Sequence, residues 1–460
     1  MICGQGPDMN CINPATEEPF DCPGEFTEQQ IHATLQSARQ AFETWRQTPV
    51  AQRGRLMKAA GAVLRRDRDR LTRLMATEMG KPIAGGEQEV EKCAWTCDFF
   101  ADHAAQMLQN ESIATDAAHS YVRYDPLGPV FAIMPWNFPF WQVFRFACPA
   151  LMTGNVGLLK HAPNVPGCAL AIERTFKEAG FPPGVFANLF LSNDQAAGVI
   201  KDPVVRAVTL TGSGRAGRSV AATAGAALKK VVLELGGSDP FIVLDDADVQ
   251  QVARAAAAAR CINSGQSCIA AKRFIVERSI AEDFEYHFKE AMCALPVGDP
   301  RDRQTAIGPM ARLDLLENLD DQVRRSVQAG ARVVCGGKRA ARKGYFYEPT
   351  VLAEVRPGMA AFDEETFGPV AALIECDGPD DAVRLANQSI FGLGASIWTQ
   401  DIERAEQLAA RIEAGCVFVN ASVKSDARLP FGGIKDSGFG RELGVPGIRE
   451  FVNVKTVWIR

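Results

Sequence analysis

Short apolar runs alternate with helix-forming segments through the middle of the chain, and this alternation restricts the folds open to it. The runs "PVFAIM" (129–134), "VGLLK" (156–160) and "AVTLT" (207–211) have the length of strands, and helix-forming segments lie between them. Such alternation predicts βαβ units with a parallel sheet. Beyond about Asp248 the pattern starts again, with "AKRFIVE" and "ARVVCGG" among helical segments. The sequence therefore predicts an α/β fold with a boundary near Gly236–Asp248.

The first hundred residues and the last segment of the chain do not show this alternation of short apolar runs and helical segments. Thr27, with Gln30 three residues on, forms a capping-box pattern that predicts the start of a helix. Further helices are expected over Val50–Met79 and about 87–108. "SYVRYDPLG" and the final "FVNVKTVWI" look like strands, and the last one alternates like an edge strand. Such a strand can pair with another subunit.

Length and composition exclude several classes of protein. A chain of 460 residues exceeds one ordinary core, and its net charge of −5, without a basic block, argues against a nucleic-acid partner. No charge-free apolar run reaches the roughly 20 residues that span a membrane. No signal peptide is visible, and thirteen irregularly spaced cysteines fit a reducing cytoplasm better than a disulfide framework. With five histidines and no Cys-x-x-Cys pair, no metal site is expected.

A glycine motif follows one of the expected strands. "TLTGSGRAG" contains Gly212, Gly214 and Gly217 in the spacing of a dinucleotide-binding fingerprint, at the start of a helix. The motif favours phosphate binding, and the alternative is a tight strand-to-helix turn. The ribose-binding acid expected about 20 residues later would be Glu234. A different role for Glu234 is given below.

Two residues draw attention by their surroundings. Cys268, in "INSGQSCIAAKR", follows a break after a helix; a lone cysteine is usually a small buried side chain, but loops also carry reactive groups. Arg145 lies in the apolar run "PFWQVFRFACPALM". A guanidinium is costly to bury without an anion. Its partner could be a structural Asp or Glu or a substrate carboxylate, or the side chain could reach a polar rim.

Seven stretches occur in one order along the chain: "MPWNFP", "LLKHAP", "TGSGRAG", "LELGG", "GQSC", "EETFGP" and "PFGGIKDSGFGRE". Together they resemble the NAD(P)-dependent aldehyde dehydrogenase superfamily, and most closely its short bacterial succinate-semialdehyde dehydrogenases. The resemblance implies a Rossmann-like cofactor-binding domain (1–109 and 127–237), a second α/β catalytic domain (238–440) and a small β oligomerisation arm (110–126 and 441–460). It also implies a homodimer or homotetramer.

The same resemblance implies three catalytic residues. Cys268 is the nucleophile that forms a thiohemiacetal and then a thioester. The side-chain amide of Asn137 and the backbone N–H of Cys268 hold the oxyanion. Glu234 activates the water that hydrolyses the thioester, a task suited to a partly desolvated carboxylate with a raised pKa.

The implied cofactor is NAD or NADP. Lys160 and Glu365 match ribose anchors, Ser213 and Gly217 match a helix N-terminus against the pyrophosphate, and Pro163 stands where many NAD-specific members carry Glu. The absence of a carboxylate there, with Lys160 and His161 beside it, indicates that NADP is tolerated. The full predicted set is Trp136, Lys160, His161, Pro163, Gly212, Ser213, Gly217, Leu235, Gly236, Glu365 and Phe367.

For the substrate, the resemblance implies an aldehyde with a carboxylate end, held by Arg145 and Ser425, with Arg428 as a weaker candidate. Succinate semialdehyde is the expected substrate; glutarate semialdehyde, a general aldehyde, a CoA-acylating reaction, an esterase and a non-catalytic binding role are the alternatives. Ser267 and Ala270 leave no second cysteine beside Cys268, so a local redox switch is not expected.

Overall fold

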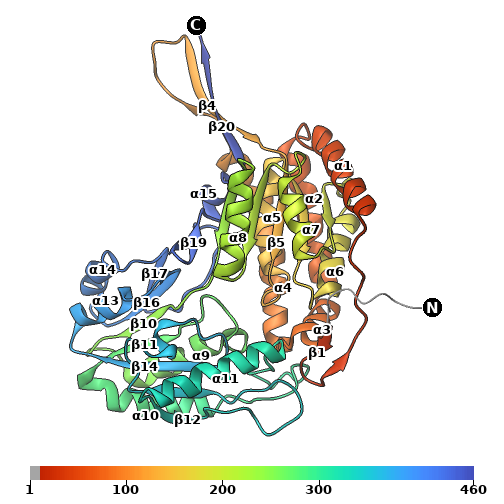
Figure 1. Cartoon of the computed structure of the whole chain (residues 1–460). Helices are drawn as coiled ribbons and strands as arrows, with labels where there is room; N and C mark the ends of the chain where they lie inside the picture. The colour runs from red at the N-terminus through yellow and green to blue at the C-terminus, as the bar shows by residue number, and fades with distance from the viewer. Residues whose placement is uncertain (1–10) are drawn as a thin grey trace.

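Two α/β units and one projecting β arm make up the protein (Figure 1). The computed structural model describes residues 11–460. The first unit holds a six-stranded sheet and the second a seven-stranded sheet. The predicted α/β fold with a separate small β element is therefore confirmed.

Four helices precede the first sheet: α1 (Glu28–Trp45), α2 (Val50–Arg66), α3 (Arg68–Met79) and α4 (Ile83–Met107). The capping box at Thr27 is present and starts α1 as predicted. The single helix expected over Val50–Met79 is wrong, because Asp67 leaves helical geometry with φ −93° and ψ 5°. Its carboxylate binds Arg66 and Arg70 on either side of the break, at 2.7 and 2.8 Å.

The first sheet has five parallel strands and one short antiparallel edge strand. From edge to edge they are β19 (Gly438–Phe439), β9 (Lys230–Glu234), β8 (Ala207–Thr211), β5 (Pro129–Met134), β6 (Val156–His161) and β7 (Phe186–Asn188). The connecting helices are α5 (Trp141–Thr153), α6 (Pro166–Glu178), α7 (Asn193–Lys201) and α8 (Gly214–Ala226). The chain order runs outward from β5 in both directions, and ligands bind at the carboxyl ends of strands beside such a reversal.

The second sheet is parallel except at one edge. Its strands, in order, are β12 (Arg332–Cys335), β13 (Thr350–Ala353), β14 (Val370–Cys376), β11 (Arg273–Glu277), β10 (Pro240–Val243), β16 (Gly394–Trp398) and β17 (Cys416–Val419). Both faces are covered, by α9 (Val249–Cys261), α10 (Ala281–Cys293), α11 (Leu313–Gln328), α13 (Pro379–Asn387) and α14 (Ile402–Ala409).

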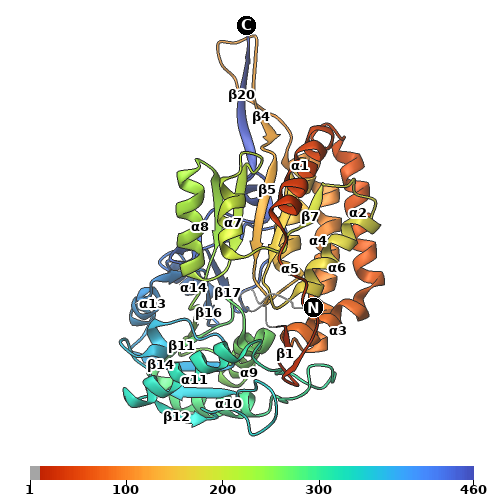
Figure 2. The ribbon, with the colours of Figure 1, turned by 45° about the vertical axis from the view of Figure 1, so that its right-hand side comes forward.

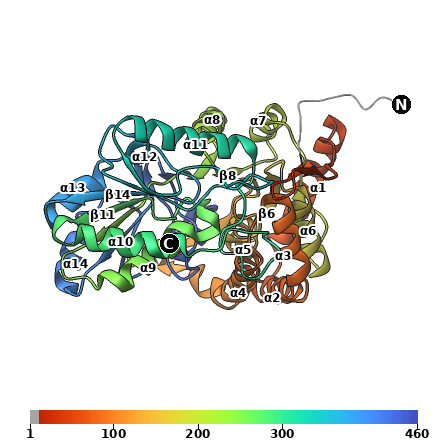
Figure 3. The same cartoon turned by 90° about the horizontal axis from the view of Figure 1, so that it is seen from below.

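Side chains of the inner strand β10 alternate between two separate cores. Phe241 packs with α9 and α10, whereas Ile242 packs with α11, α13 and α14. Figure 3 shows α10 and α11 on opposite sides of β11 and β14. Burial on both faces explains why these strands read as continuous apolar runs rather than as alternating ones.

The arm consists of β20 (Val452–Ile459), β4 (His119–Pro126) and β3 (Glu111–Ser112) in one antiparallel sheet. It projects from the body of the protein in both side views (Figure 2). Val454, Trp458 and Ile459 on β20 are exposed. The domain boundaries given above stay a prediction; β19 crosses them, because Gly438–Phe439 pairs with β9 of the first sheet.

Smaller elements complete the fold: β1 (Ile12–Asn13), β2 (Glu18–Pro19), α12 (Ala360–Asp363), β15 (Phe391–Gly392), β18 (Ile434–Lys435) and α15 (Gly444–Ile448). One disulfide corrects the expectation of reduced cysteines. The β1–β2 hairpin brings Cys11 and Cys22 to a Cα–Cα distance of 5.9 Å, and they are bonded. Ten other cysteines are free, and Cys3 lies outside the described residues. Across residues 11–460, no helix is long and apolar enough to cross a bilayer.

Candidate active site

Cys268 lies on a loop that begins with a sharp reversal after α9. Asn263, Ser264 and Gly265 have successive positive φ values of 53°, 57° and 75°. Glycine is required at the third position, because a Cβ on Gly265 would lie 2.2 Å from the Gly368 carbonyl oxygen. The predicted break between the helix and Cys268 is confirmed.

The buried side chain of Lys272 anchors this loop through three hydrogen bonds. Lys272 Nζ donates to the carbonyl oxygens of Ser267, Cys268 and Ala270 at 3.1, 2.8 and 3.0 Å. These carbonyls therefore all point to one side. In the described part of the chain the Cys268 N–H has no acceptor, so it can donate to a ligand oxygen.

Asn137, on the loop after β5, is tied to the same segment. Its Nδ2 donates to the Gln266 carbonyl at 3.1 Å, and Asn263 Nδ2 donates to the Asn137 carbonyl at 2.7 Å. The side chain is buried. An amide nitrogen has two N–H groups, so one remains for an oxyanion beside Cys268.

Glu234 ends β9 as a buried carboxyl group, only 2% exposed. Its Oε1 has no hydrogen-bond partner among residues 11–460. Burial raises the pKa of Glu234 well above its usual range, although the positive charge of Arg145 opposes the shift. When it is ionised, a carboxylate with a raised pKa is a stronger base than an ordinary glutamate.

The thiol of Cys268 is also in a poorly solvated place. Burial raises its pKa to about 12, although Arg145 and Lys272 lower it. Since the thiolate is the nucleophile, the resting protein holds Cys268 mainly as a thiol. A base or a bound positive charge is therefore needed to activate it.

Arg145 on α5 has a partner from its own chain. Its guanidinium forms a buried ion pair with Glu442, donates from Nη2 to Thr211 Oγ1 at 3.2 Å and lies 4.8 Å from the centre of the Phe431 ring. Of the alternatives left open above, the structural carboxylate partner is the one present. The burial of Arg145 therefore does not by itself require a substrate carboxylate.

A cavity of about 350 Å³ lies at the carboxyl ends of β5, β6 and β8, and Lys160 and Ser213 both line it. Ser213 caps α8, where its Oγ accepts the Ala216 N–H at 3.3 Å. A Cβ on Gly217 would lie 2.6 Å from Leu235, so only glycine allows α8 to pack this closely. The nearby Gly212 N–H donates to the Glu234 carbonyl at 2.9 Å. The Gly motif thus forms a helix N-terminus beside a cavity, which suits a phosphate.

Arg215 lines the same cavity and was missed by the sequence reasoning. It falls inside the quoted motif "TGSGRAG", so its position could have been noticed. Lys160 and Arg215 together give this cavity two cations.

The predicted role of His161 as a positive charge needs correction. Its Nε2 donates to the Pro139 carbonyl at 2.9 Å, and its Nδ1 accepts the Ala162 N–H at 2.9 Å. Burial lowers the pKa of His161 to about 4, so the ring is neutral near pH 7. It supports the turn before Pro163, whose carbonyl oxygen lies 3.6 Å from Cys11 Sγ.

The remaining predicted cofactor residues meet beside the Cys268 loop. Glu365 Oε1 accepts the Gly237 N–H at 3.0 Å, and a Cβ on Gly236 would lie 2.4 Å from Glu365 Oε2. Trp136 and Phe367 pack edge to face with ring centroids 5.8 Å apart. This group can therefore contact one ligand.

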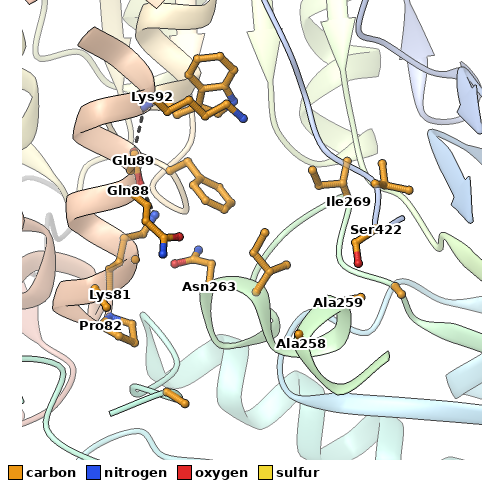
Figure 4. Close-up of a pocket in the computed structure, with 18 of the residues that line it drawn as sticks. Lys81, Pro82, Gln88, Glu89, Lys92, Ala258, Ala259, Asn263, Ile269 and Ser422 are labelled. Carbon is orange, nitrogen blue, oxygen red and sulfur yellow. Dashed lines mark hydrogen bonds and ion pairs between the residues drawn. The ribbon is translucent and has the colours of Figure 1, made fainter. Parts of the chain in front are cut away.

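A second cavity, of about 550 Å³, lies between α4 and the segment that contains Asn263 and Ile269 (Figure 4). Phe138, which follows Asn137, and Ile269, which follows Cys268, both line it. Gln88, Glu89 and Lys92 of α4 form one wall, across the cavity from Ile269 and Ser422. The cavity therefore reaches the residues beside the candidate nucleophile and oxyanion donor.

Ser425 is buried at the edge of this cavity and bonded to two of its lining residues. Its Oγ accepts from Lys92 Nζ at 2.8 Å and from Trp141 Nε1 at 3.1 Å. Lys92 was missed by the sequence reasoning; the only signal was a lysine among buried positions of a long helix. Arg428, the weaker substrate candidate, pairs instead with Asp426 and is exposed.

Comparison with known proteins gives one consistent picture. A family model described as "Aldehyde dehydrogenase family" matches residues 2–457. The chain is 51% identical to "Probable succinate-semialdehyde dehydrogenase (NADP(+))" of Synechocystis sp., covering 97% of this chain and 99% of that protein. It is 49% identical to "Succinate semialdehyde dehydrogenase (NAD(P)+) Sad" of Escherichia coli, covering 97% of each. A crystal structure of succinic semialdehyde dehydrogenase from Streptococcus pyogenes with NADP+ superposes with a TM-score of 0.96 at 36% identity, covering 98% and 99% of the two chains.

Proposed function

Because the chain belongs to the aldehyde dehydrogenase family, we propose that it oxidises succinate semialdehyde to succinate with NAD or NADP. The observation that carries the proposal is the convergence of Cys268 and Asn137 beside a cavity, with the buried carboxyl of Glu234 at the adjacent strand end. The names of the similar proteins support the choice of substrate.

In this proposal the Cys268 thiol loses its proton to solvent, the sulfur bonds to the aldehyde carbon, and the carbonyl electrons move to the oxygen. Asn137 Nδ2 and the Cys268 N–H donate to that oxyanion; loss of one such donor typically costs about 10²–10³ in rate. A nicotinamide, when bound, would accept the hydride that leaves the former aldehyde carbon, and this loss leaves a thioester on Cys268. Glu234 then takes a proton from water, the water oxygen attacks the thioester carbon, and the C–S bond breaks to release the acid and Cys268.

We assign the cofactor's adenosine side to the cavity lined by Lys160, Ser213 and Arg215. The close contact of Gly217 with Leu235 and the capped start of α8 fit a pyrophosphate there. Pro163 offers no carboxylate that would repel a 2′-phosphate. We therefore propose that NADP is accepted and that Lys160 and Arg215 favour it.

We assign the acid end of the substrate to the cavity beside α4, where Ser425 is hydrogen-bonded to the lining residues Lys92 and Trp141. Arg145 contributes its positive field there, since its charge lowers the pKa values of both Cys268 and Lys92. The exposed edge and apolar side chains of the arm support a homodimer or homotetramer. The ten free thiols support a cytoplasmic location.

The test is a kinetic panel of succinate semialdehyde, glutarate semialdehyde and butanal, each with NAD and NADP. We expect the highest kcat/KM with succinate semialdehyde, followed as reduced nicotinamide. An equal kcat/KM for butanal would reject the carboxylate-bearing substrate. Formation of acyl-CoA on addition of CoA would reject hydrolysis assisted by Glu234.

A further inference from the structure

The cavity beside α4 contains a lysine whose charge has no carboxylate partner. Lys92 Nζ binds Ser425 Oγ at 2.8 Å and lies 4.0 Å from the centre of the Trp141 ring. Across residues 11–460, no carboxylate oxygen lies within 4.0 Å of it. A half-buried ammonium with only a hydroxyl and an aromatic face as neighbours is incompletely neutralised.

The other cations around this cavity are already paired. Lys81 lines the cavity and forms a buried ion pair with Glu89, and Arg145 forms one with Glu442. Each of these cations would lose a carboxylate if it turned to a substrate. Lys92 would lose no carboxylate partner by binding a substrate. An anion that enters the cavity should therefore be attracted most strongly to Lys92.

We propose that Lys92, together with the Ser425 hydroxyl, binds the terminal carboxylate of the substrate and sets the preference for acidic aldehydes. The inference rests on the proposed function and adds the residue that distinguishes an acidic from a neutral aldehyde. Arg145, held by Glu442, acts on the same cavity through its field and is not the direct anchor.

The hydrogen bonds at Ser425 fit a carboxylate. Its oxygen accepts from both Lys92 and Trp141, and its own O–H proton has no acceptor in the described part of the chain. An ammonium has three N–H groups, of which one points to Ser425. A carboxylate placed between them can accept from the Lys92 ammonium and from the Ser425 hydroxyl, one bond at each oxygen.

The position of Lys92 also fits a substrate that spans the cavity. Its aldehyde end would lie near Cys268 and Asn137, next to the lining residues Ile269 and Phe138. Its acid end would lie at Lys92 on the wall formed by α4 (Figure 4). Trp141 packs against the ammonium and limits the directions from which an anion approaches.

The experiment compares kcat/KM for succinate semialdehyde and for uncharged butanal in the wild type, Lys92→Met and Lys92→Arg. Methionine keeps most of the side-chain length and removes the charge. We expect Lys92→Met to lower kcat/KM for succinate semialdehyde on the order of 10–100-fold and to change that for butanal less than about 3-fold. Lys92→Arg should restore most of the preference, which a purely structural role would not predict.

Lys58→Met is the matched control, because it removes an exposed cation that is paired with Asp102. It should leave both values unchanged. Equal losses for both aldehydes in Lys92→Met, or an unchanged ratio, would overturn the role of Lys92. If the methionine variant does not fold, Lys92→Gln and competitive inhibition by succinate give the same comparison.

A wild type with no preference for succinate semialdehyde over butanal would instead reject the proposed function. A wild type with that preference, retained in Lys92→Met, rejects only the inference about Lys92. The two failures are therefore distinguishable.

Discussion

The cavity proposed for the cofactor, lined by Lys160 and Ser213, and the cavity proposed for the aldehyde, lined by Lys92 and Ile269, are built by different means. At the start of α8, beside the first of these cavities, contacts join residues near one another in the chain, such as Ser213 with Ala216 and Gly217 with Leu235. On the aldehyde side, contacts join distant segments, such as Lys92 with Ser425 and Arg145 with Glu442.

The two sides should therefore be sensitive to different kinds of substitution. The cofactor side depends on shape, because backbone and small residues leave room for a ligand. The aldehyde side depends on charge balance, since each buried ion must keep its partner. Substitutions should therefore separate the two sides by the property that each one changes.

The largest expected effect is at Cys268, next to the aldehyde-side lining residue Ile269. Cys268→Ala removes the proposed nucleophile and should lower aldehyde oxidation by at least about 10⁴-fold. NADP binding, followed by fluorescence titration, should remain close to that of the wild type. A variant that retained oxidation would show that another group forms the covalent bond.

The second prediction concerns charge balance on the aldehyde side. Glu442→Gln leaves Arg145 buried without a charged partner and should lower the free energy of unfolding by about 3–5 kcal/mol. Chemical denaturation measures this loss. The double variant Arg145→Met with Glu442→Gln should recover part of it. A single variant as stable as the wild type would show that the ion pair is dispensable.

The third prediction is a pH dependence of the reactivity of Cys268, which precedes the cavity-lining residue Ile269. Because the pKa of Cys268 is about 12, its thiolate fraction should rise about tenfold for each pH unit between pH 7 and 9. The rate of alkylation by iodoacetamide without cofactor should follow that slope, with Cys268→Ala as the blank. A plateau below pH 9 would mean that the resting thiol is already activated.

The fourth prediction tests shape on the cofactor side. Gly217→Ala places a methyl group against Leu235 and should push α8 outward, weakening NADP binding about tenfold. The ratio of kcat/KM between succinate semialdehyde and butanal should stay constant. A changed ratio with unchanged NADP affinity would remove the distinction between the two sides. Gly225→Ala is the matched control, since a Cβ there meets no atom within 4 Å.

The smallest effect is expected at the exposed edge of the cofactor cavity. Arg215→Met removes a solvent-exposed cation, so its contribution to NADP over NAD should be only about 2–5-fold. The measurement is the ratio of KM values at low and at high salt. Salt should reduce the wild-type ratio toward that of the variant.

The family, the parallel sheets and the catalytic candidates could be predicted because their signals are local. The match to the aldehyde dehydrogenase family confirms the resemblance carried by the seven motifs. Strand-end residues such as Glu234 and Ser213 inherit their positions from the sheet once the strands are identified. The three-residue reversal before Cys268 was visible as a break in a helical pattern.

The rest depends on contacts that no short stretch contains. Glu442 and Ser425 reach their partners only after the C-terminal segment folds back onto α4 and α5. From the sequence, His161 is expected to carry a positive charge. In the structure, burial lowers the pKa of its ring, which is neutral and forms two hydrogen bonds. Cys11 and Cys22 required the hairpin that joins them. The pairing of distant side chains depends on tertiary structure. The hydrophobic periodicity of the sequence carries no information about that pairing.

The alanines of α9 suggest a route to engineering substrate length. Ala258, at the exposed part of the cavity wall, and the buried Ala259 both line the 550 Å³ space (Figure 4). Neither contributes a polar group, so larger apolar residues at these two positions would shorten the cavity without altering its charges. A small library at Ala258 and Ala259 could therefore select shorter or longer aldehydes while the catalytic residues stay untouched.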